Sequence, residues 1–241
     1  MGPSELPGYP SRLRVGGDPV TAPTRDVALS LFPDIKPDLP IGKMAGSVIP
    51  GTNADLIAAI APLYLDGNTV MDVTYGRGGW WKRYRPPGLI AHDKETLDGV
   101  DFRRLPEGDR SVDVVCFDPP YIPAGGQGTS TAPDYRDRFG ITPYRSQAEL
   151  DDLVRSGLAE CARVFCRWLL VKCCDYVNAN HFTLGHRKIL NWADELGLTD
   201  DGDPWDLIVH HSGSGPGGHN IYNPIRARRH HSYLLVFKAG V

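Results

Sequence analysis

The chain has 241 residues, which is enough for one α/β domain with a buried core, and its net charge is −3. This charge argues against a protein that coats nucleic acid by neutralising phosphates, and no apolar run reaches the roughly 18 residues that cross a bilayer. Because the N-terminal region also lacks the apolar core of a secretory signal, we expect a cytoplasmic protein without a membrane segment. The five cysteines include no CxxC motif and predict neither a disulfide framework nor a zinc site.

The first part of the chain, residues 1–40, is rich in proline and is expected to form an extended N-terminal arm. The remainder, residues 41–241, is expected to be a single domain. Its first element is a helix over 51–65, where apolar residues repeat at helical spacing and Thr52 or Asn53 can cap the start. Three short apolar strands are then predicted, at 68–74, 88–92 and 112–117.

The second half of the domain contains two stretches without clear periodicity, 122–146 and 212–229, which are predicted to be loops inserted in it. Between them the apolar pattern predicts two helices and two strands, in the order helix 149–165, strand 168–174, helix 186–196 with Gly197 at its end, and strand 205–210. The last strand is predicted over 232–238.

Strands that alternate with helices and are continuously apolar are typical of a parallel sheet covered by helices on both faces. The last two predicted strands are joined by a loop without a helix, so the final strand is expected to be antiparallel. The sequence therefore predicts an α/β fold with a mostly parallel sheet.

Ligands of such sheets bind beyond the carboxyl ends of the strands, and three successive segments carry polar chemistry there. The first strand runs into a glycine-rich turn, where the absence of a Cβ lets the backbone approach a ligand. An acid about 20 residues further on suits a ribose diol, and an Asp-Phe pair suits the amino group and ring of an adenine. The cofactor candidates are Asp72, Thr74, Gly76, Gly78, Asp93, Asp101 and Phe102.

The sequence Asp118-Pro119-Pro120-Tyr121 directly follows a predicted strand and is the candidate catalytic centre. Pro119 and Pro120 fix φ and lack N–H groups, so carbonyls near Asp118 are free to accept from a ligand. A carboxylate beside a carbonyl matches the two hydrogens of an amino group on a base, and both acceptors stabilise charge that develops on its nitrogen. Tyr121 offers a flat face on which an extruded base can stack. A proline-rich turn closed by an aspartate is the alternative.

With the motifs VMDVTYGRGG and DPPY, the chain resembles the amino-methyltransferase family that forms N6-methyladenine or N4-methylcytosine in DNA. The run DFRRLPEGDRSVDVVCFDPPY is similar to two linked motifs of that family, and VIPGTNADL is similar to its helix before the cofactor strand. The resemblance covers roughly residues 43–238. It implies a Rossmann-like methyltransferase fold and S-adenosylmethionine as cofactor.

By this resemblance, Asp72, Gly76 and Gly78 contact the methionine end of the cofactor, while Asp93 binds the ribose. Asp101 and Phe102 bind the adenine of the cofactor, and Asp118 and Tyr121 hold the target amine. The aspartate at position 118 favours adenine over cytosine. Trp80 and Trp81 depart from the family pattern, since they are bulky for the mouth of a cofactor site.

No separate target-recognition domain is evident in the sequence, so nucleic-acid contacts are expected from the arm, from the two loops or from a partner protein. The candidates are Arg136, Arg138, Arg226, Arg228 and Arg229. DNA is the expected substrate, with four alternatives: an RNA amino-methyltransferase, a cytosine-N4 DNA methyltransferase, a protein-glutamine methyltransferase, or a catalytically silent binding subunit. The histidines late in the chain lack metal-binding spacing, and no metal is expected. Lys172 and Asp175 either solubilise a strand end or belong to the site.

Overall fold

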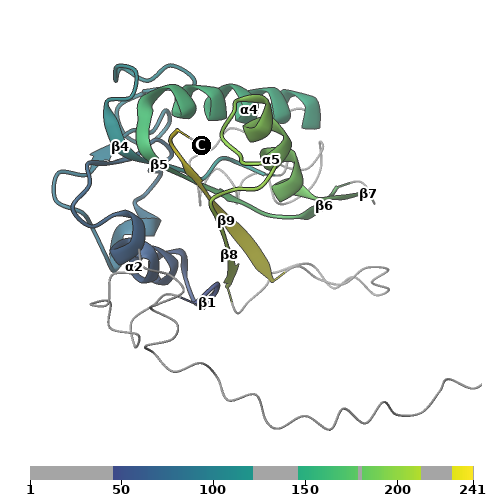
Figure 1. Cartoon of the computed structure of the whole chain (residues 1–241), viewed down its shortest axis with the longest axis horizontal. Coiled ribbons are helices and arrows are strands. Elements are labelled where there is room, and N and C mark those ends of the chain that lie inside the picture. Colours follow the sequence, from purple (N-terminus) through teal and green to yellow (C-terminus); the bar gives the residue numbers. More distant parts are fainter. Residues whose placement is uncertain (1–45, 122–145, 179–180, 213–229, 241) are drawn as a thin grey trace, which may run out of the picture. The chain divides into compact units, whose positions relative to one another are not determined.

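The computed structural model describes residues 46–121, 146–178, 181–212 and 230–240 (Figure 1). Its helices are α2 (Asn53–Tyr64), the 3-10 helix η2 (Gly79–Lys82), α4 (Gln147–Val164) and α5 (Gly185–Glu195). Its strands are β1 (Val48–Pro50), β2 (Val70–Asp72), β3 (Ile90–Ala91), β4 (Val112–Phe117), β5 (Phe165–Cys173), β6 (Tyr176–Asn178), β7 (His181–Thr183), β8 (Asp206–His211) and β9 (His231–Lys238). The predicted arm and nearly all of the two predicted loops lie outside the described residues, so these predictions stay untested.

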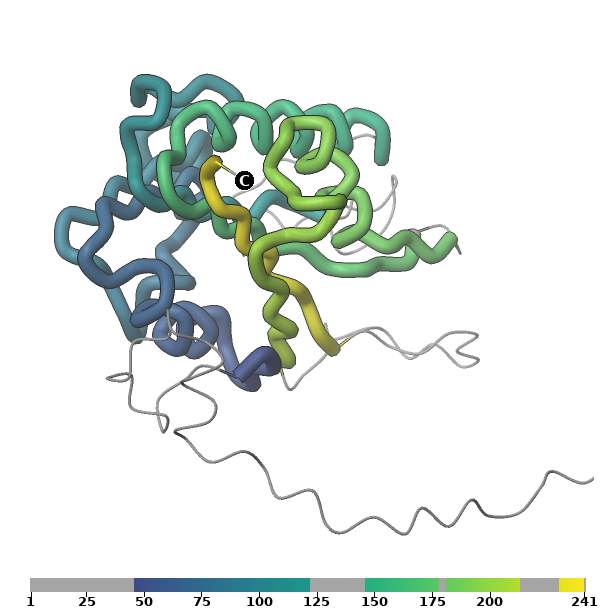
Figure 2. The backbone as a smooth tube through the Cα atoms, viewed as in Figure 1, coloured from purple at the N-terminus to yellow at the C-terminus, as the bar shows by residue number. Residues whose placement is uncertain are grey.

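Seven strands form one sheet in the order β1-β8-β9-β5-β4-β2-β3. The pairs β1–β8, β2–β3, β2–β4 and β4–β5 are parallel, whereas β9 is antiparallel to both β5 and β8. Figure 2 shows β9, in yellow, lying beside β8. The prediction of a mostly parallel sheet with an antiparallel last strand is confirmed.

The sheet is covered on both faces, as its continuously apolar strands predict (Figure 1). Side chains alternate along each strand, so Val114 and Cys116 of β4 pack on the side of α2 and η2. Val115 and Phe117 of the same strand pack on the opposite side, among residues of α4 and α5. These two apolar layers fix which face each polar residue at a strand end projects toward.

The helix ends follow the local sequence. Thr52 caps α2 through a capping box, in which its hydroxyl accepts from the Asp55 N–H and the Asp55 carboxylate accepts from the Thr52 N–H. Ser146 caps α4 by accepting from Glu149 N–H. Gly197 follows α5 with φ +67°, the left-handed conformation that ends many helices. In the described part of the chain, no helix has the length and apolar character that crossing a membrane requires.

Three short strands were missed because three residues are too few for an apolar pattern. β1 extends the sheet at its edge beside β8, whereas the resemblance of the run VIPGTNADL to a helix of the family implies no strand there. β6 and β7 form a separate two-stranded sheet before α5. The start of β5 was also predicted three residues late, because α4 ends at Val164 and the strand begins at the very next residue.

Candidate active site

Polar side chains that belong to separate strands meet at the carboxyl edge of the sheet. Asp72 is the last residue of β2, and it pairs in register with Cys116 on the α2 side of the sheet. Asp118 follows β4 two residues after Cys116 and therefore projects to the same side. The fold thus unites the candidate cofactor strand with the candidate catalytic motif.

Two adjacent tryptophans of η2 hold these two acids. The Trp81 indole N–H donates to Asp72 Oδ2 at 2.6 Å, and the Trp80 indole N–H donates to Asp118 Oδ2 at 3.0 Å. Both indoles are buried in the core between η2, α2 and the sheet. From the sequence, this pair is expected only to add bulk at the cofactor mouth. The available signal was that a buried indole needs an acceptor for its N–H.

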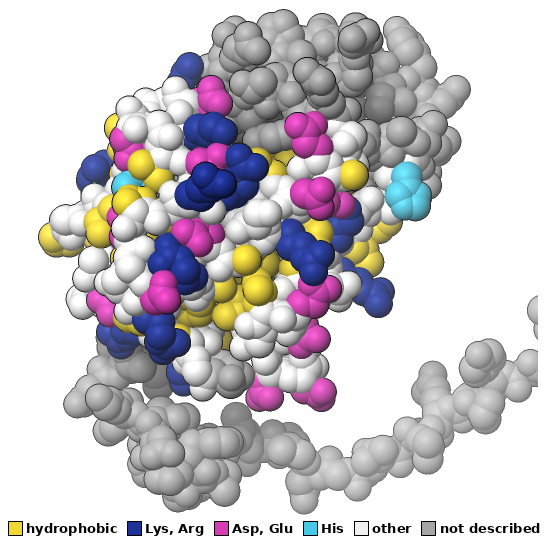
Figure 3. Space-filling view, turned by 90° about the horizontal axis from the view of Figure 1, so that it is seen from above, with side chains coloured by type: hydrophobic (Ala, Val, Ile, Leu, Met, Phe, Trp, Pro, Cys, Tyr) yellow, Lys and Arg dark blue, Asp and Glu magenta, His cyan; other side chains and the backbone are white. Residues whose placement is uncertain are grey.

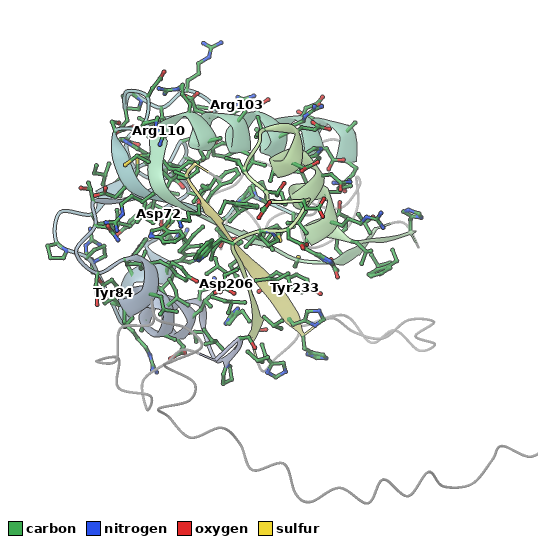
Figure 4. The ribbon with its side chains drawn as sticks, in the orientation of Figure 1. Asp72, Tyr84, Arg103, Arg110, Asp206 and Tyr233 are labelled. Atoms are coloured by element: carbon green, nitrogen blue, oxygen red, sulfur yellow. The ribbon has the colours of Figure 1, made fainter. Side chains whose placement is uncertain are left out.

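Asp72 lies inside the molecule, with 3% of its surface exposed (Figure 4). Its Oδ1 accepts from the backbone N–H of Thr74 at 2.9 Å, and its Oδ2 is taken by Trp81. Burial raises the pKa of Asp72 to about 7, against the opposing effect of these hydrogen bonds, and the charge of Asp118 raises it further. Asp72 is therefore a buried acid whose charge changes near neutral pH.

Thr74 connects the turn after β2 to the catalytic motif. Its hydroxyl accepts from the backbone N–H of Asp118 at 2.8 Å and donates to Asp72 Oδ1 at 3.3 Å. This chain of bonds fixes the position of Asp118 relative to the glycine-rich turn.

Asp118 is half-buried, and both its oxygens have partners: Trp80 on Oδ2 and the Tyr121 hydroxyl on Oδ1. Burial raises the pKa of Asp118, whereas the Lys172 charge and the Trp80 hydrogen bond lower it. The carboxylate is thus fixed in direction by an indole and a phenol. The partner of Oδ1, Tyr121, belongs to the same Asp118–Tyr121 motif.

On the side of α4 and α5, the motif Pro119–Tyr121 forms one wall of an open pocket. The opposite walls come from α4, from the segment between β5 and β6, and from α5. They comprise Leu150, Asp151, Val154, Cys173, Cys174, Tyr176, Gly185, Lys188, Ile189 and Trp192. These walls are mainly apolar, with one ion pair between Lys188 Nζ and Asp151 Oδ2 at 2.6 Å. Walls of this kind favour apolar over highly charged surface.

The glycine-rich turn has the backbone shape that its sequence predicts. Gly76 and Gly78 have φ values of +54° and +69°, and a Cβ on Gly78 would lie 2.7 Å from the Tyr75 hydroxyl oxygen. The Gly76 N–H donates to Asp93 Oδ2 at 2.8 Å, while Asp93 Oδ1 accepts from Thr96 N–H at 2.8 Å. Asp93 therefore joins the turn after β2 to the loop after β3.

Asp101 and Phe102 have partners of their own. Both Asp101 oxygens bind Arg103, and Oδ2 also pairs with Lys94 at 3.0 Å. The Arg103 guanidinium in particular holds the pKa of Asp101 well below its usual range. Phe102 packs edge-on against Phe117 with ring centroids 5.1 Å apart. To accept from an adenine amino group, Asp101 would have to give up part of its ion pair, so that role stays a prediction.

Lys172 and Asp175 are both buried, and the interpretation that they solubilise a strand end is wrong. The Lys172 ammonium donates to Asn53 Oδ1 at 2.8 Å. Asp175 Oδ2 accepts from the Tyr233 hydroxyl at 3.2 Å, and its Oδ1 lies 2.7 Å from His186 Nδ1. Figure 4 labels Tyr233 on β9. Polar side chains therefore continue along this edge from β2 across β4 and β5 to β9.

The five arginines predicted to contact nucleic acid lie outside the described residues. On the face shown in Figure 3, basic and acidic side chains are interspersed over the described surface. Within 46–121, 146–178, 181–212 and 230–240, no group of three or more His, Cys, Asp and Glu side chains is arranged to hold a metal ion.

Comparison with known proteins yields structural likenesses only. No family model and no curated protein matches the chain. Among solved structures it is similar to TTHA0409 of Thermus thermophilus in complex with S-adenosyl-L-methionine, at 18% identity and a TM-score of 0.36, over 57% of this chain and 50% of that one. The chain thus spans about half the length of TTHA0409.

Two further likenesses extend over more of the neighbour. The first is to a SAM-dependent methyltransferase of Aquifex aeolicus, at 11% identity and a TM-score of 0.37, over 78% of this chain and 89% of that one. The second is to the 1,6-didemethyltoxoflavin-N1-methyltransferase of Burkholderia thailandensis, at 12% identity and a TM-score of 0.39, over 92% of each chain.

Proposed function

We propose that this chain transfers a methyl group from S-adenosylmethionine to the exocyclic amino group of a nucleic-acid base, with adenine N6 in DNA as the preferred target. One observation carries the proposal. The Asp118 carboxylate stands at a strand end, oriented by Trp80 and Tyr121, and its backbone is bonded through Thr74 to the turn after β2. A turn of common structural type would need none of these bonds.

The residues at the edge of the sheet fit the proposed cofactor. A Cβ on Gly76 would have Thr74 O, at 3.9 Å, as its nearest described neighbour, so a ligand could approach the backbone here, whereas the Tyr75 ring fills the corresponding space at Gly78. Asp93 Oδ2 accepts the Gly76 N–H, and a carboxylate oxygen can accept a second bond, for example from a ribose hydroxyl. When bound, the cofactor supplies a sulfonium methyl group, which an amine nitrogen attacks directly.

The chain's own residues would then act on the amine. Asp118 Oδ1 and a carbonyl of the following prolines accept its two hydrogens, which favours a tetrahedral nitrogen and stabilises the positive charge that develops there. The amine would displace the Tyr121 hydroxyl from Oδ1. The cofactor would supply the methyl group to this nitrogen and would leave with the electron pair of its sulfur–carbon bond. The nitrogen then releases one proton to water.

The polymer and the base are the finer parts of the proposal. An aspartate at position 118, rather than a serine, supports adenine N6 through the family resemblance. The apolar walls beside Pro119–Tyr121 suit a flat heterocycle, and extruding one from a duplex costs a few kcal/mol. RNA and cytosine N4 are the other outcomes that a substrate screen distinguishes.

The test combines a binding measurement with a transfer measurement. Calorimetry would measure the Kd of S-adenosylmethionine for the wild type, for Asp118→Asn and for Asp109→Asn, a surface control. Transfer of a radiolabelled methyl group would be measured on unmethylated duplex DNA, single-stranded DNA and RNA. We expect Asp118→Asn to bind the cofactor with little change and to lose transfer about 100-fold or more. Absence of cofactor binding by the wild type would leave only the silent-subunit alternative.

A further inference from the structure

Lys172 occupies the position beside Asp118 on the neighbouring strand. The parallel pair β4–β5 aligns Cys116 with Leu170 and Phe117 with Val171, so the next residues in register are Asp118 and Lys172. Neighbouring strands lie about 4.8 Å apart, and residues aligned in a parallel pair project to the same side. Here that side is the α2 side, where both Cys116 and Leu170 are buried.

The lysine is enclosed rather than exposed, because only 7% of its surface is accessible. Its ammonium donates to Asn53 Oδ1 at 2.8 Å, and Asn53 is the first residue of α2. Buried lysines are rare unless they are paired, and an amide oxygen does not neutralise the positive charge. The positive charge of this ammonium therefore has to be balanced by a nearby anion.

The charged and titratable groups around the pair identify that anion. Burial raises the pKa of Asp118 and the charge of Lys172 on β5 lowers it, while the charge of Asp118 adds to burial in raising the pKa values of Asp72 on β2 and of the Cys173 and Cys174 thiols. From β8, the imidazole of His210 faces Lys172, and the lysine charge contributes with burial to a lowered pKa of that histidine. Asp72 repels a negative charge on Asp118, whereas Lys172 is the cation that favours it.

We propose that Lys172, anchored by Asn53, is a positioning residue for the reaction that keeps the Asp118 carboxylate anionic and available as a hydrogen-bond acceptor. A protonated Asp118 would offer one acceptor fewer to the target amine, so the charge on Lys172 matters for transfer. The lysine acts through Asp118 and needs no contact with the substrate. This inference rests on the proposed function.

The test titrates Asp118 directly and does not require activity. The full chain would be labelled with carboxyl-¹³C aspartate, and its Asp118 resonance would be assigned from the spectrum of Asp118→Asn. We expect Lys172→Gln, which keeps a side chain able to bond Asn53, to raise the measured pKa of Asp118 by about one to two pH units. Lys172→Arg should keep the wild-type titration. Lys238→Met, at the opposite edge of the sheet, is the matched lysine control.

Activity gives a second readout. Transfer requires ionised Asp118, so the acid limb of the kcat/KM profile should move toward neutral pH by the same amount in Lys172→Gln. An Asp118 titration in folded Lys172→Gln that matches the wild type would overturn the inference and leave the proposed function standing. A wild type that binds the cofactor but methylates none of the polymers would overturn the proposed function instead. If Lys172→Gln does not fold, Asn53→Ala provides the test. Loss of the hydrogen bond that anchors Lys172 should raise the pKa of Asp118 by part of that amount. An unchanged Asp118 titration in Asn53→Ala would contradict the role of Lys172 as a positioning residue.

Discussion

The hydrogen bond from Trp81 to Asp72 allows a prediction whose size and pH dependence both follow from the structure. Trp81→Phe keeps an aromatic ring but removes the only indole N–H that Asp72 Oδ2 receives in the described residues. Asp72 is 3% exposed, so no water replaces the lost donor freely. Removing one hydrogen bond to a buried charged acceptor costs about 1.5–3 kcal/mol.

The pH dependence separates this effect from lost packing. Burial raises the pKa of Asp72 to about 7 from 3.8, a difference worth about 4 kcal/mol. The contribution of Asp72 to the free energy of unfolding is therefore fully present below about pH 3.8, and it is lost as the pH rises through about 7. Without the Trp81 donor the pKa rises further, so the loss continues to higher pH. At pH 9 we expect Trp81→Phe to lose about 1.5–3 kcal/mol of unfolding free energy beyond what its lost packing costs. At pH 5, where Asp72 is protonated, this additional loss should be small.

Urea unfolding followed by far-ultraviolet circular dichroism at pH 5, 7 and 9 measures these differences. Trp168→Phe is the matched control, because Trp168 packs on Tyr64 with ring centroids 5.3 Å apart and bonds neither acid. Its destabilisation should be the same at all three pH values. An equal destabilisation of Trp81→Phe at pH 5 and pH 9 would refute the assignment of Asp72 as a buried acid stabilised by the indole.

Two further predictions concern packing and capping, and the same unfolding assay measures both. Gly157→Ala should destabilise the protein by about 1–3 kcal/mol, because the added Cβ would lie 2.5 Å from the Phe102 ring and 2.9 Å from the Phe117 ring. An unchanged free energy of unfolding would mean that Phe102 moves freely. Thr52→Ala should cost about 1 kcal/mol through loss of the α2 cap, whereas Thr52→Ser should cost much less, and equal losses would rule out the hydroxyl as the cause.

Much of the architecture could be predicted from local patterns alone. Continuously apolar strands indicated a sheet covered on both faces, and the absence of a helix between the last two strands indicated that β9 is antiparallel. The caps at Thr52 and Gly197 were also predictable, because a cap depends on residues within one helical turn. The short strands β1, β6 and β7 were not, because three residues are too few for an apolar pattern, and β1 in addition pairs with the distant strand β8.

The sequence by itself determined the candidate motifs and their order along the chain: a glycine-rich turn after one strand, and Asp118–Tyr121 after another. Only the tertiary structure decided which side chains serve them. Trp80 and Trp81 donate to the two acids across neighbouring elements, Lys172 stands in register with Asp118 on the next strand, and no spacing in the sequence encodes this arrangement. The physical reason is that the charge state of a buried carboxylate depends on the groups that replace its water, and folding alone brings those groups together.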